Sequence, residues 1–315
     1  MKVNVGVDMG GTRIKIGLVA NGELVAHEKI KADSNVNFTS RLEAIKKHID
    51  QLLIAHNCTA QSIGLAFPDI VNSDRNKIIS KYVKYPGSDK VDLDAWALES
   101  WGIPIVVEND ARAALLGEWQ YGAGRGCDNL VLITLGTGVG TAVMVNGRIL
   151  RGKHYLAGNL GGHMTINVHG ATCNCGNVGC LESESSTWAL QRKVKTYPDF
   201  PKSALAKEQE IDFDAVFRHA NAGDKLASRI KADCLKAWTF GIINLIHAYD
   251  PERIIMGGGI MKSKEIIIPY LKEMITKHSW INEDEIELMA ASQVEYAGIL
   301  GACYLSTASK KEHIL

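Results

Sequence analysis

The sequence predicts an α/β protein built from two related halves, each of which opens with a three-stranded β-meander. Short apolar runs at 3–7 (VNVGV) and 130–135 (LVLITL) each end at a glycine turn, as buried strands commonly do. In both halves a second strand and an Asn-Gly dipeptide follow, at Asn21-Gly22 and at Asn146-Gly147. Asn-Gly between apolar runs is a strong hairpin signal. The repeated order therefore indicates one folding unit that occurs twice.

The elements of the first half follow from their local patterns. Residues 13–20 begin with polar and apolar side chains in alternation, which predicts a half-buried strand, and residues 23–30 are expected to return as a third strand. The elements expected further along are a helix at 38–56, a strand at 62–67, a polar loop at 72–90, a helix at 92–100, a strand at 103–107, and a helix from Asn109 or Asp110 to about 119.

The second half repeats the meander, with strands expected at 141–145 and in RILRG after the Asn-Gly turn. The later expected elements are a mostly helical stretch at 183–249, a strand at 253–256, and a last helix at 297–309 that packs on the first half. We find no low-complexity linker, so we expect a hinge of two chain crossings near 112 and 299. The expected domains are 1–112 with 300–315, a small N-terminal domain, and 113–299, a large domain with a cysteine-rich loop.

Composition excludes several classes of protein. The 315 residues contain 35 Lys plus Arg and 35 Asp plus Glu. This neutral balance argues against nucleic acid as a main partner, because phosphate binding needs a basic surface. The N-terminus reads as a strand and not as a signal peptide, and no run of eighteen apolar residues could span a membrane. We therefore expect a cytoplasmic protein with reduced cysteines.

Three glycine turns follow apolar strands. Such turns can bring backbone N–H groups close to phosphates, although each alone also fits a plain hairpin or a strand–helix connection. Asp8 precedes the first turn and could orient Mg²⁺ through water. None of the turns matches the P-loop pattern. The candidate nucleotide-binding residues are Asp8, Gly10, Gly11, Thr12, Gly136, Thr137, Gly138, Gly257, Gly258 and Gly259.

The segment ENDARAALLGEW at 108–119 places three polar residues at the end of a strand. Ligands of α/β sheets bind at such carboxyl edges. An Asn or Asp there also caps a helix, which explains one of these residues but not all three. We expect Asp110 to act as a general base and Asn109 to hold neighbouring substrate hydroxyls.

Cys173, Cys175 and Cys180 lie within eight residues. A redox pair or a disulfide is an alternative, but three thiols cannot form a closed disulfide set, and a structural zinc site needs one further ligand. His163 or His169 could supply it. The spacing favours zinc.

With these motifs the chain resembles the ROK family of repressors, open reading frames and kinases over essentially its whole length. DMGGT resembles the first phosphate motif of that family, ENDARAALLGE its catalytic segment, and LGTGVG its second phosphate loop. GHMTI with CNCGNVGCLE resembles the zinc and sugar signature, and MGGG the adenosine loop. The resemblance implies the two-domain actin-like ATPase fold (sugar kinase/ribonuclease H-like) with duplicated β-meander halves, closing over ligand at a hinge.

The resemblance also implies an activity and a set of roles. The activity is ATP-dependent transfer of phosphate to a hexose or N-acetylhexosamine, usually at the 6-hydroxyl, with Mg²⁺, by a chain that forms a homodimer. Asp110 would be the base, and Asn109, His163 and Glu182 would bind sugar hydroxyls. A structural Zn²⁺ would be held by His163, Cys173, Cys175 and Cys180, which selects His163 over His169.

Two places depart from the family pattern on the sugar side. Leu160 stands where a sugar-contacting glutamate is usual, and we expect Asn159 to replace it. In FPDIVN, Asp69 stands for a glycine and Asn72 for an aspartate. The sequence therefore predicts a kinase without naming its sugar. The alternatives are a sugar-responsive regulator, for which we expect no room for a helix-turn-helix before Asp8, and a non-catalytic sugar sensor.

Overall fold

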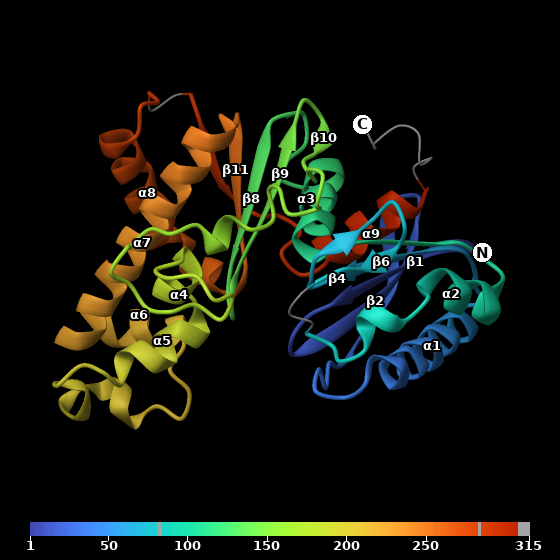
Figure 1. Ribbon diagram of the computed structural model, residues 1–315, viewed down its shortest axis with the longest axis horizontal. Coiled ribbons are helices and arrows are strands. Elements are labelled where there is room, and N and C mark those ends of the chain that lie inside the picture. Colours follow the sequence, from blue (N-terminus) through green and yellow to red (C-terminus); the bar gives the residue numbers. More distant parts are fainter. Residues whose placement is uncertain (81–83, 283–284, 308–315) are drawn as a thin grey trace. The chain divides into compact units, whose positions relative to one another are not determined.

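The computed structural model describes residues 1–80, 84–282 and 285–307 (Figure 1). Its contacts divide the chain into two units. The first unit comprises Met1–Asp128, Asn146–Asn159 and Ala291–Leu315, and the second comprises Asn129–Val145 and Leu160–Ala290. The chain thus crosses between the units four times, where two crossings were expected. Residues 113–128 and 146–159 belong to the first unit, whereas the expected division placed them in the large domain at 113–299.

The sheet of the first unit has five strands in the order β3-β2-β1-β4-β7. β1 pairs antiparallel with β2, which pairs antiparallel with β3, as the meander predicted. β1, β4 and β7 run parallel, so their carboxyl ends lie at one edge of the sheet. The strands are β1 (Lys2–Met9), β2 (Arg13–Ala20), β3 (Glu23–Lys31), β4 (Thr59–Phe67) and β7 (Ile105–Asn109).

Strand alternation assigns the two faces of this sheet to different helices. Odd-numbered residues of β1 and β4, such as Val5 and Leu65, join the core formed with α1 (Phe38–Ala55) and α2 (Leu93–Trp101). On the opposite face Gly6 and Gly64 admit α9 (Ala297–Thr307), because a Cβ at either position would overlap α9 backbone. In Figure 1, α1 and α2 lie on one side of these strands and α9 on the other.

α3 (Asp110–Tyr121) packs closely on α9, which explains why residues 113–128 belong to the first unit. An ideal Cβ at Gly117 would lie 2.1 Å from the Ala297 carbonyl oxygen, and one at Gly301 would lie 1.7 Å from that of Ala113. The expected packing of the last helix on the first half is confirmed. Residues 308 and 309 of the expected helix lie outside the described residues.

The expected polar loop at 72–90 contains more order than its sequence suggested. It includes part of a two-stranded ribbon of β5 (Val71–Asn72) and β6 (Lys77–Ile78), and the short 3-10 helix η1 (Ser88–Lys90). Asn76 stabilises this ribbon, because its buried amide donates to the Ile105 carbonyl and accepts from the Val107 N–H. Residues 81–83 lie outside the described part.

The second unit contains four strands of the other five-stranded sheet, in the order β9-β8-β11-β12. β8 and β9 are antiparallel, whereas β11 is parallel to both β8 and β12. The third strand expected after Asn146-Gly147 is only two residues long, β10 (Arg148–Ile149). The other strands are β8 (Leu130–Leu135), β9 (Val139–Val145), β11 (Arg253–Gly257) and β12 (Glu287–Ala290).

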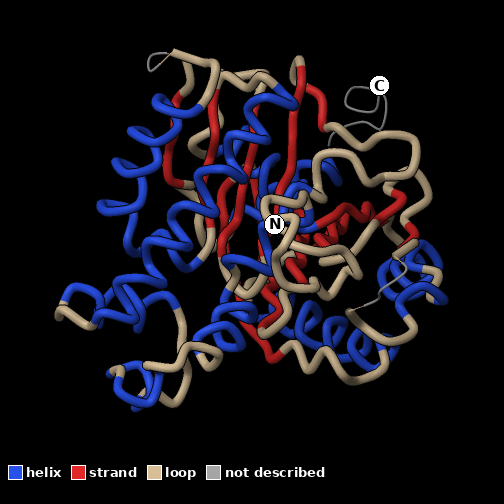
Figure 2. Tube along the Cα trace, turned by 60° about the vertical axis from the view of Figure 1, so that its left-hand side comes forward, coloured by secondary structure: helices blue, strands red, loops and turns tan. Residues whose placement is uncertain are grey.

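Helices pack beside these strands and on one another. α7 contacts α4, α6 and α8, and α8 contacts β12. In Figure 2 the strands, in red, are flanked by helices, in blue. The α-helices of this unit are α4 (Leu181–Ser185), α5 (Thr187–Val194), α6 (Phe213–Asn221), α7 (Lys225–Tyr249) and α8 (Lys264–His278), and its 3-10 helices are η2 (Gly161–His163), η3 (Phe200–Lys202), η4 (Ala204–Lys207) and η5 (Gly259–Ser263). Among the described residues, no helix has the length and apolar character needed to cross a membrane.

The α3–α9 contact generates a stability prediction. Gly301→Ala should lower the free energy of unfolding by about 1–3 kcal/mol, because the added methyl would force the two helices apart. Thermal or urea unfolding measures the change, with Gln51→Ala on the exposed side of α1 as the control. The control should change stability by less than about 0.5 kcal/mol. Equal stability of both variants would contradict the close packing.

Candidate functional site

The carboxyl edge of the first sheet gathers polar residues from three parallel strands. Asp8 lies near the end of β1, Asp69 follows β4, and Asn109 ends β7 immediately before Asp110. Asn109 connects two of these strand ends, because its Nδ2 donates to the Asp69 carbonyl at 3.2 Å and to Asp110 Oδ1 at 3.0 Å. The predicted base and the predicted asparagine therefore lie together with Asp69, which the sequence marked only as a departure from the family pattern.

Asn109 is the N-cap of α3. Its Oδ1 accepts from the backbone N–H groups of Ala111, at 3.1 Å, and Arg112, at 3.2 Å. The capping interpretation weighed from sequence thus applies to Asn109. The two hydrogens on Asn109 Nδ2 donate to the Asp69 carbonyl and to Asp110 Oδ1. The second of these bonds orients the Asp110 carboxyl.

Asp110 is half-buried, and desolvation raises the pKa of its carboxyl from 3.8 to about 6. Lys84 and the Ala111 N–H lower this pKa, whereas the carboxylates of Asp8 and Asp69 raise it. Burial also raises the pKa of Asp69 to about 6, against the backbone N–H and the charge of Lys84. Two carboxyls at this edge thus titrate near the pH range where a general base is useful.

Glu108, whose role the sequence left open, belongs to a buried ion-pair network beneath Asp110. Its side chain is 1% exposed and lies 2.8 Å from Arg151 and 3.5 Å from Arg112. Arg112 is fully buried, and its NH2 donates to the carbonyls of Tyr155 and Ala157. The network ties the start of α3 to the 146–159 segment. Glu108 is therefore structural.

The first glycine turn lies next to a loop that the sequence analysis did not include in the site. The Gly10 N–H donates to the Arg13 carbonyl, and the Gly10 carbonyl accepts from the Tyr85 hydroxyl at 2.7 Å. The backbone N–H of Lys84 donates to Asp69 Oδ2 at 2.9 Å. Asp8 forms a cross-strand ion pair with Lys15 at 3.0 Å. The only sequence signal for Lys84 and Tyr85 is a Tyr-Pro-Gly turn after a polar loop.

Asn159, the expected substitute for a glutamate, is 8% exposed in the first unit. Its Oδ1 is buried and has no hydrogen-bond partner within the described residues. A buried acceptor of this kind normally has a partner. Asn159 therefore has an acceptor available for a ligand hydroxyl.

In the second unit two predicted glycine turns are brought together. Gly257 of β11 pairs with Thr134 of β8, so the turns that follow these parallel strands are neighbours. Gly258 has φ +93°, and a Cβ there would lie 2.1 Å from the Leu135 carbonyl oxygen. The start of α5 also binds the turn after β8, since the Thr187 N–H donates to the Gly136 carbonyl. A Cβ at Gly136 or at Gly259 would meet no atom within 4 Å, so the backbone is open at these two positions.

Glu182 contacts the same turn. Its Oε2 accepts from the Val139 N–H at 2.8 Å, and its Oε1 accepts from the Trp188 indole at 3.2 Å. A Cβ at Gly138 would lie 2.5 Å from Oε2. The carboxylate that follows the third cysteine is thus directed at the second glycine turn by its protein partners.

The four predicted metal ligands form one cluster. The ligand atoms of His163, Cys173, Cys175 and Cys180 all lie within 4.8 Å of one another. His163 Nδ1 is 3.6 Å from Cys173 Sγ, and the Sγ atoms of Cys175 and Cys180 are 3.7 Å apart. A tetrahedral zinc with bonds of about 2.3 Å separates its sulfur ligands by about 3.7 Å. The donor set therefore fits zinc, and His169 is not part of the cluster.

Backbone pairing connects the two ends of the cysteine loop. Thr165 and Cys180 form an isolated β-bridge, and the Leu181 N–H donates to the Met164 carbonyl at 3.0 Å. Desolvation raises the pKa values of the Cys173 and Cys180 thiols. The hydrogen bond between Leu181 and Met164 fixes the positions of the adjoining residues, Glu182 and His163.

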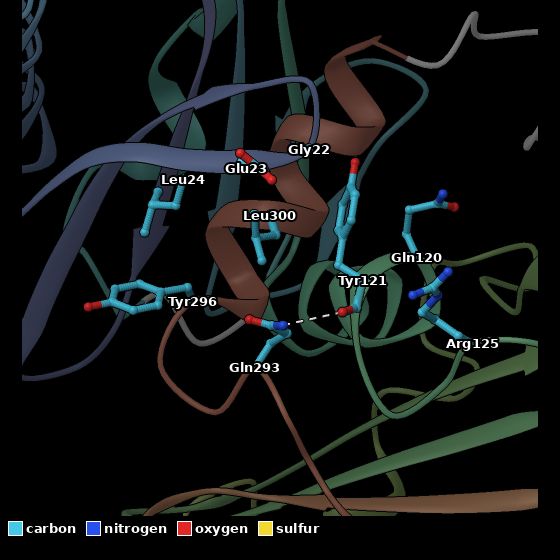
Figure 3. Close-up of a pocket in the computed structure, with 9 residues that line it drawn as sticks. All are labelled: Gly22, Glu23, Leu24, Gln120, Tyr121, Arg125, Gln293, Tyr296 and Leu300. Carbon is cyan, nitrogen blue, oxygen red and sulfur yellow. Dashed lines mark hydrogen bonds between the residues drawn. The ribbon is translucent and has the colours of Figure 1, made fainter.

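A pocket of about 520 Å³ occurs elsewhere in the first unit, where the β2–β3 turn, the end of α3 and the start of α9 meet (Figure 3). Gln293 Nε2 donates to the Tyr121 carbonyl at 3.2 Å across its lining. None of the predicted site residues lines it. The lining residues are Gly22, Glu23, Leu24, Gln120, Tyr121, Arg125, Gln293, Tyr296 and Leu300.

Comparisons with known proteins agree with these features. The family model described as the ROK family matches residues 4–309. Glucokinase from Thermotoga maritima is 32% identical over 308 residues, which cover 95% of each chain. The xylose repressor of Bacillus subtilis is 26% identical over 310 residues, covering 95% of this chain and 75% of the repressor.

Solved structures agree as well. A ROK family glucokinase from Streptomyces griseus, in complex with glucose and AMPPNP, has a TM-score of 0.80 at 26% identity, covering 96% of this chain and 99% of that chain. The expected actin-like sugar-kinase fold is confirmed. The chain belongs to the ROK family.

Proposed function

We propose that this protein transfers the γ-phosphoryl group of ATP to the 6-hydroxyl of a hexose. The observation that carries the proposal is the half-buried carboxyl of Asp110, which Asn109 orients at the sheet edge where the first glycine turn also lies. A carboxylate in that place can accept a hydroxyl proton. The names of the similar proteins, glucokinase among them, support the same reaction.

The residues of the first unit would act mainly by holding Asp110, the sugar and the phosphate in place. Asn109 fixes Asp110, and Asn159 offers its free acceptor to a sugar hydroxyl. The turn at Gly10, Gly11 and Thr12 offers backbone donors to phosphate. Mg²⁺, when bound with ATP, would neutralise phosphate charge, and Asp8 is the residue that would orient it through water.

In the second unit the glycine turns at 136–138 and 257–259 would accommodate the nucleotide, since they offer close backbone approach. His163 and Glu182 are assigned to sugar recognition. Zinc in the four-residue cluster would have a structural role: it would stiffen the loop that carries these two residues. The fit of the donor distances to a tetrahedral site supports this role.

A sugar-responsive regulator is the second candidate, because the xylose repressor is 26% identical to this chain over 310 residues. A regulator does not need a general base at this sheet edge. A coupled ADP-release screen with ATP and Mg²⁺ separates the two candidates. Its panel comprises glucose, mannose, fructose, allose and N-acetylhexosamines. Sugar-dependent ADP release supports the kinase, whereas sugar binding without ADP release supports the regulator.

Asp110→Asn should lower kcat by about 10²–10⁴-fold, the usual contribution of a general base. The sugar dissociation constant, measured by calorimetry without ATP, should change little because the side chain keeps its size. Asp89→Asn, at an exposed carboxylate of η1, is the matched control and should retain the activity of the unsubstituted chain. Near-normal turnover of Asp110→Asn would remove this residue from the base role.

The pH profile should reflect the raised pKa of Asp110. A base must be deprotonated, so kcat/KM should fall as pH drops through about 6 and level off above it. Asp69→Asn removes a negative charge that raises this pKa, so the acidic limb should move to lower pH. An acidic limb that stays in place or moves to higher pH would contradict the assignment.

Metal analysis of the purified protein should find about one zinc per chain. Cys175→Ser should lose most of this zinc and weaken sugar binding, because His163 and Glu182 lose their support. Cys58→Ser, at a cysteine outside the cluster, serves as the control. A folded Cys175→Ser variant with unchanged sugar affinity would contradict the supporting role, and zinc-free native protein would contradict the site itself.

A further inference from the structure

Arg13 directly follows the first glycine turn, and Lys15 is the next cation along β2. P-loop enzymes place a lysine directly after their phosphate loop, whereas this turn reads Gly10-Gly11-Thr12-Arg13. The next cation, Lys15, is paired with Asp8 at 3.0 Å. The phosphoryl transfer proposed for this edge needs a positive group that can contact the negatively charged oxygens of the transferred group.

Lys84 reaches the turn from a distant part of the sequence. An ideal Cβ built on Gly11 would lie 3.1 Å from Lys84 Cε and 3.2 Å from its Nζ. The ammonium group thus lies against the middle glycine of the turn. The Lys84 side chain is exposed, and no ion pair joins it to any other residue that the structure describes.

The backbone beneath Lys84 is anchored on both sides. Its own N–H donates to Asp69 Oδ2 at 2.9 Å, and the hydroxyl of the next residue, Tyr85, donates to the Gly10 carbonyl at 2.7 Å. The Tyr85 ring is fully buried and packs against Phe38 and Phe67. A long, exposed cationic side chain thus extends from an anchored backbone position beside the turn.

Lys84 also acts electrostatically on the predicted base. Its positive charge lowers the pKa values of Asp110 and Asp69. Desolvation raises both values by more than Lys84 lowers them. The ammonium therefore lies within electrostatic range of Asp110 while it contacts Gly11. The acceptor hydroxyl and the transferred group must meet between the base and a phosphate-binding turn. Lys84 lies against the turn, and its charge acts on the base.

We propose that Lys84 is a further catalytic residue of the proposed kinase and that its ammonium contacts the phosphoryl group during transfer. In this step the sugar oxygen forms a bond to the γ-phosphorus as the bond from that phosphorus to the β,γ-bridging oxygen breaks. The electron pair of the broken bond leaves with ADP, and the hydroxyl proton passes to Asp110. Lys84 exchanges no proton and stabilises the charge on the transferred oxygens.

The test compares Lys84→Met, Lys84→Arg and Arg13→Met with the unsubstituted full-length protein, on the best sugar of the panel. Lys84→Met should lower kcat by about 100-fold or more, as the loss of one transition-state donor does. Its sugar dissociation constant and melting temperature should stay close to normal, and Lys84→Arg should recover a large part of the loss because the charge is retained. Lys90→Met, at the exposed end of η1, should behave like the unsubstituted chain.

The outcomes separate this proposal from the one on which it rests. An unsubstituted chain that phosphorylates no sugar overturns both. An active chain in which Lys84→Met matches Lys90→Met overturns the role of Lys84 alone. A weaker sugar affinity with unchanged kcat would make Lys84 a sugar ligand and not a phosphoryl contact. A loss of kcat in Arg13→Met, with normal kcat in Lys84→Met, would show that Arg13 and not Lys84 contacts the phosphoryl group.

Discussion

Parallel pairing of β1, β4 and β7 is the constraint on which the candidate site of the first unit depends. Because these strands end at one edge, Asp8, Asp69 and Asp110 lie near one another although they are distant in sequence. Desolvation is the main cause of the raised pKa of Asp110, and the carboxylates of Asp8 and Asp69 at the same edge raise this pKa further. The raised pKa of Asp110 is therefore a consequence of the topology as well as of its own surroundings.

The position of Asp110 depends in turn on how α3 is held. Asn109 caps the helix, and Glu108 with Arg112 anchors its first turn to the 146–159 segment. At the other end, Glu118 is fully buried and accepts from the N–H groups of Ser292 and Gln293, just after a crossing between the units. α3 thus begins at Asp110, the proposed general base. It contacts two segments that lie next to crossings between the units, 146–159 and the segment that begins at Ala291. Its close packing on α9 completes the support.

Local patterns predicted much of this molecule. The duplicated meanders, the glycine turns, the segment at 108–110 and the cysteine cluster carry their signal in neighbouring residues. The second meander was predicted less well, because β10 is only two residues long. The expectations did not include α8 or β12, and β12 is a four-residue strand on which little periodicity can be recognised. The division into units also differed, because the α3–α9 contact joins residues far apart in the chain.

The site was predicted where its residues follow strands and was missed where tertiary contacts bring them in. Lys84 follows a polar loop, and only the contacts of Asp69 and Tyr85 bring it to the first turn. The bond from the Val139 N–H to Glu182 joins two motifs that sequence reasoning treated separately. The sugar-binding role expected for Asn109 stays a prediction, and the sequence did not show that its amide also caps α3 and orients Asp110.

A crystal structure of the protein with a hexose and a non-hydrolysable ATP analogue tests the central claim most directly. We predict that one sugar hydroxyl lies within hydrogen-bond distance of the Asp110 carboxyl, with the terminal phosphate of the analogue facing that hydroxyl. A complex in which both ligands are bound and every sugar hydroxyl lies away from Asp110 would contradict it.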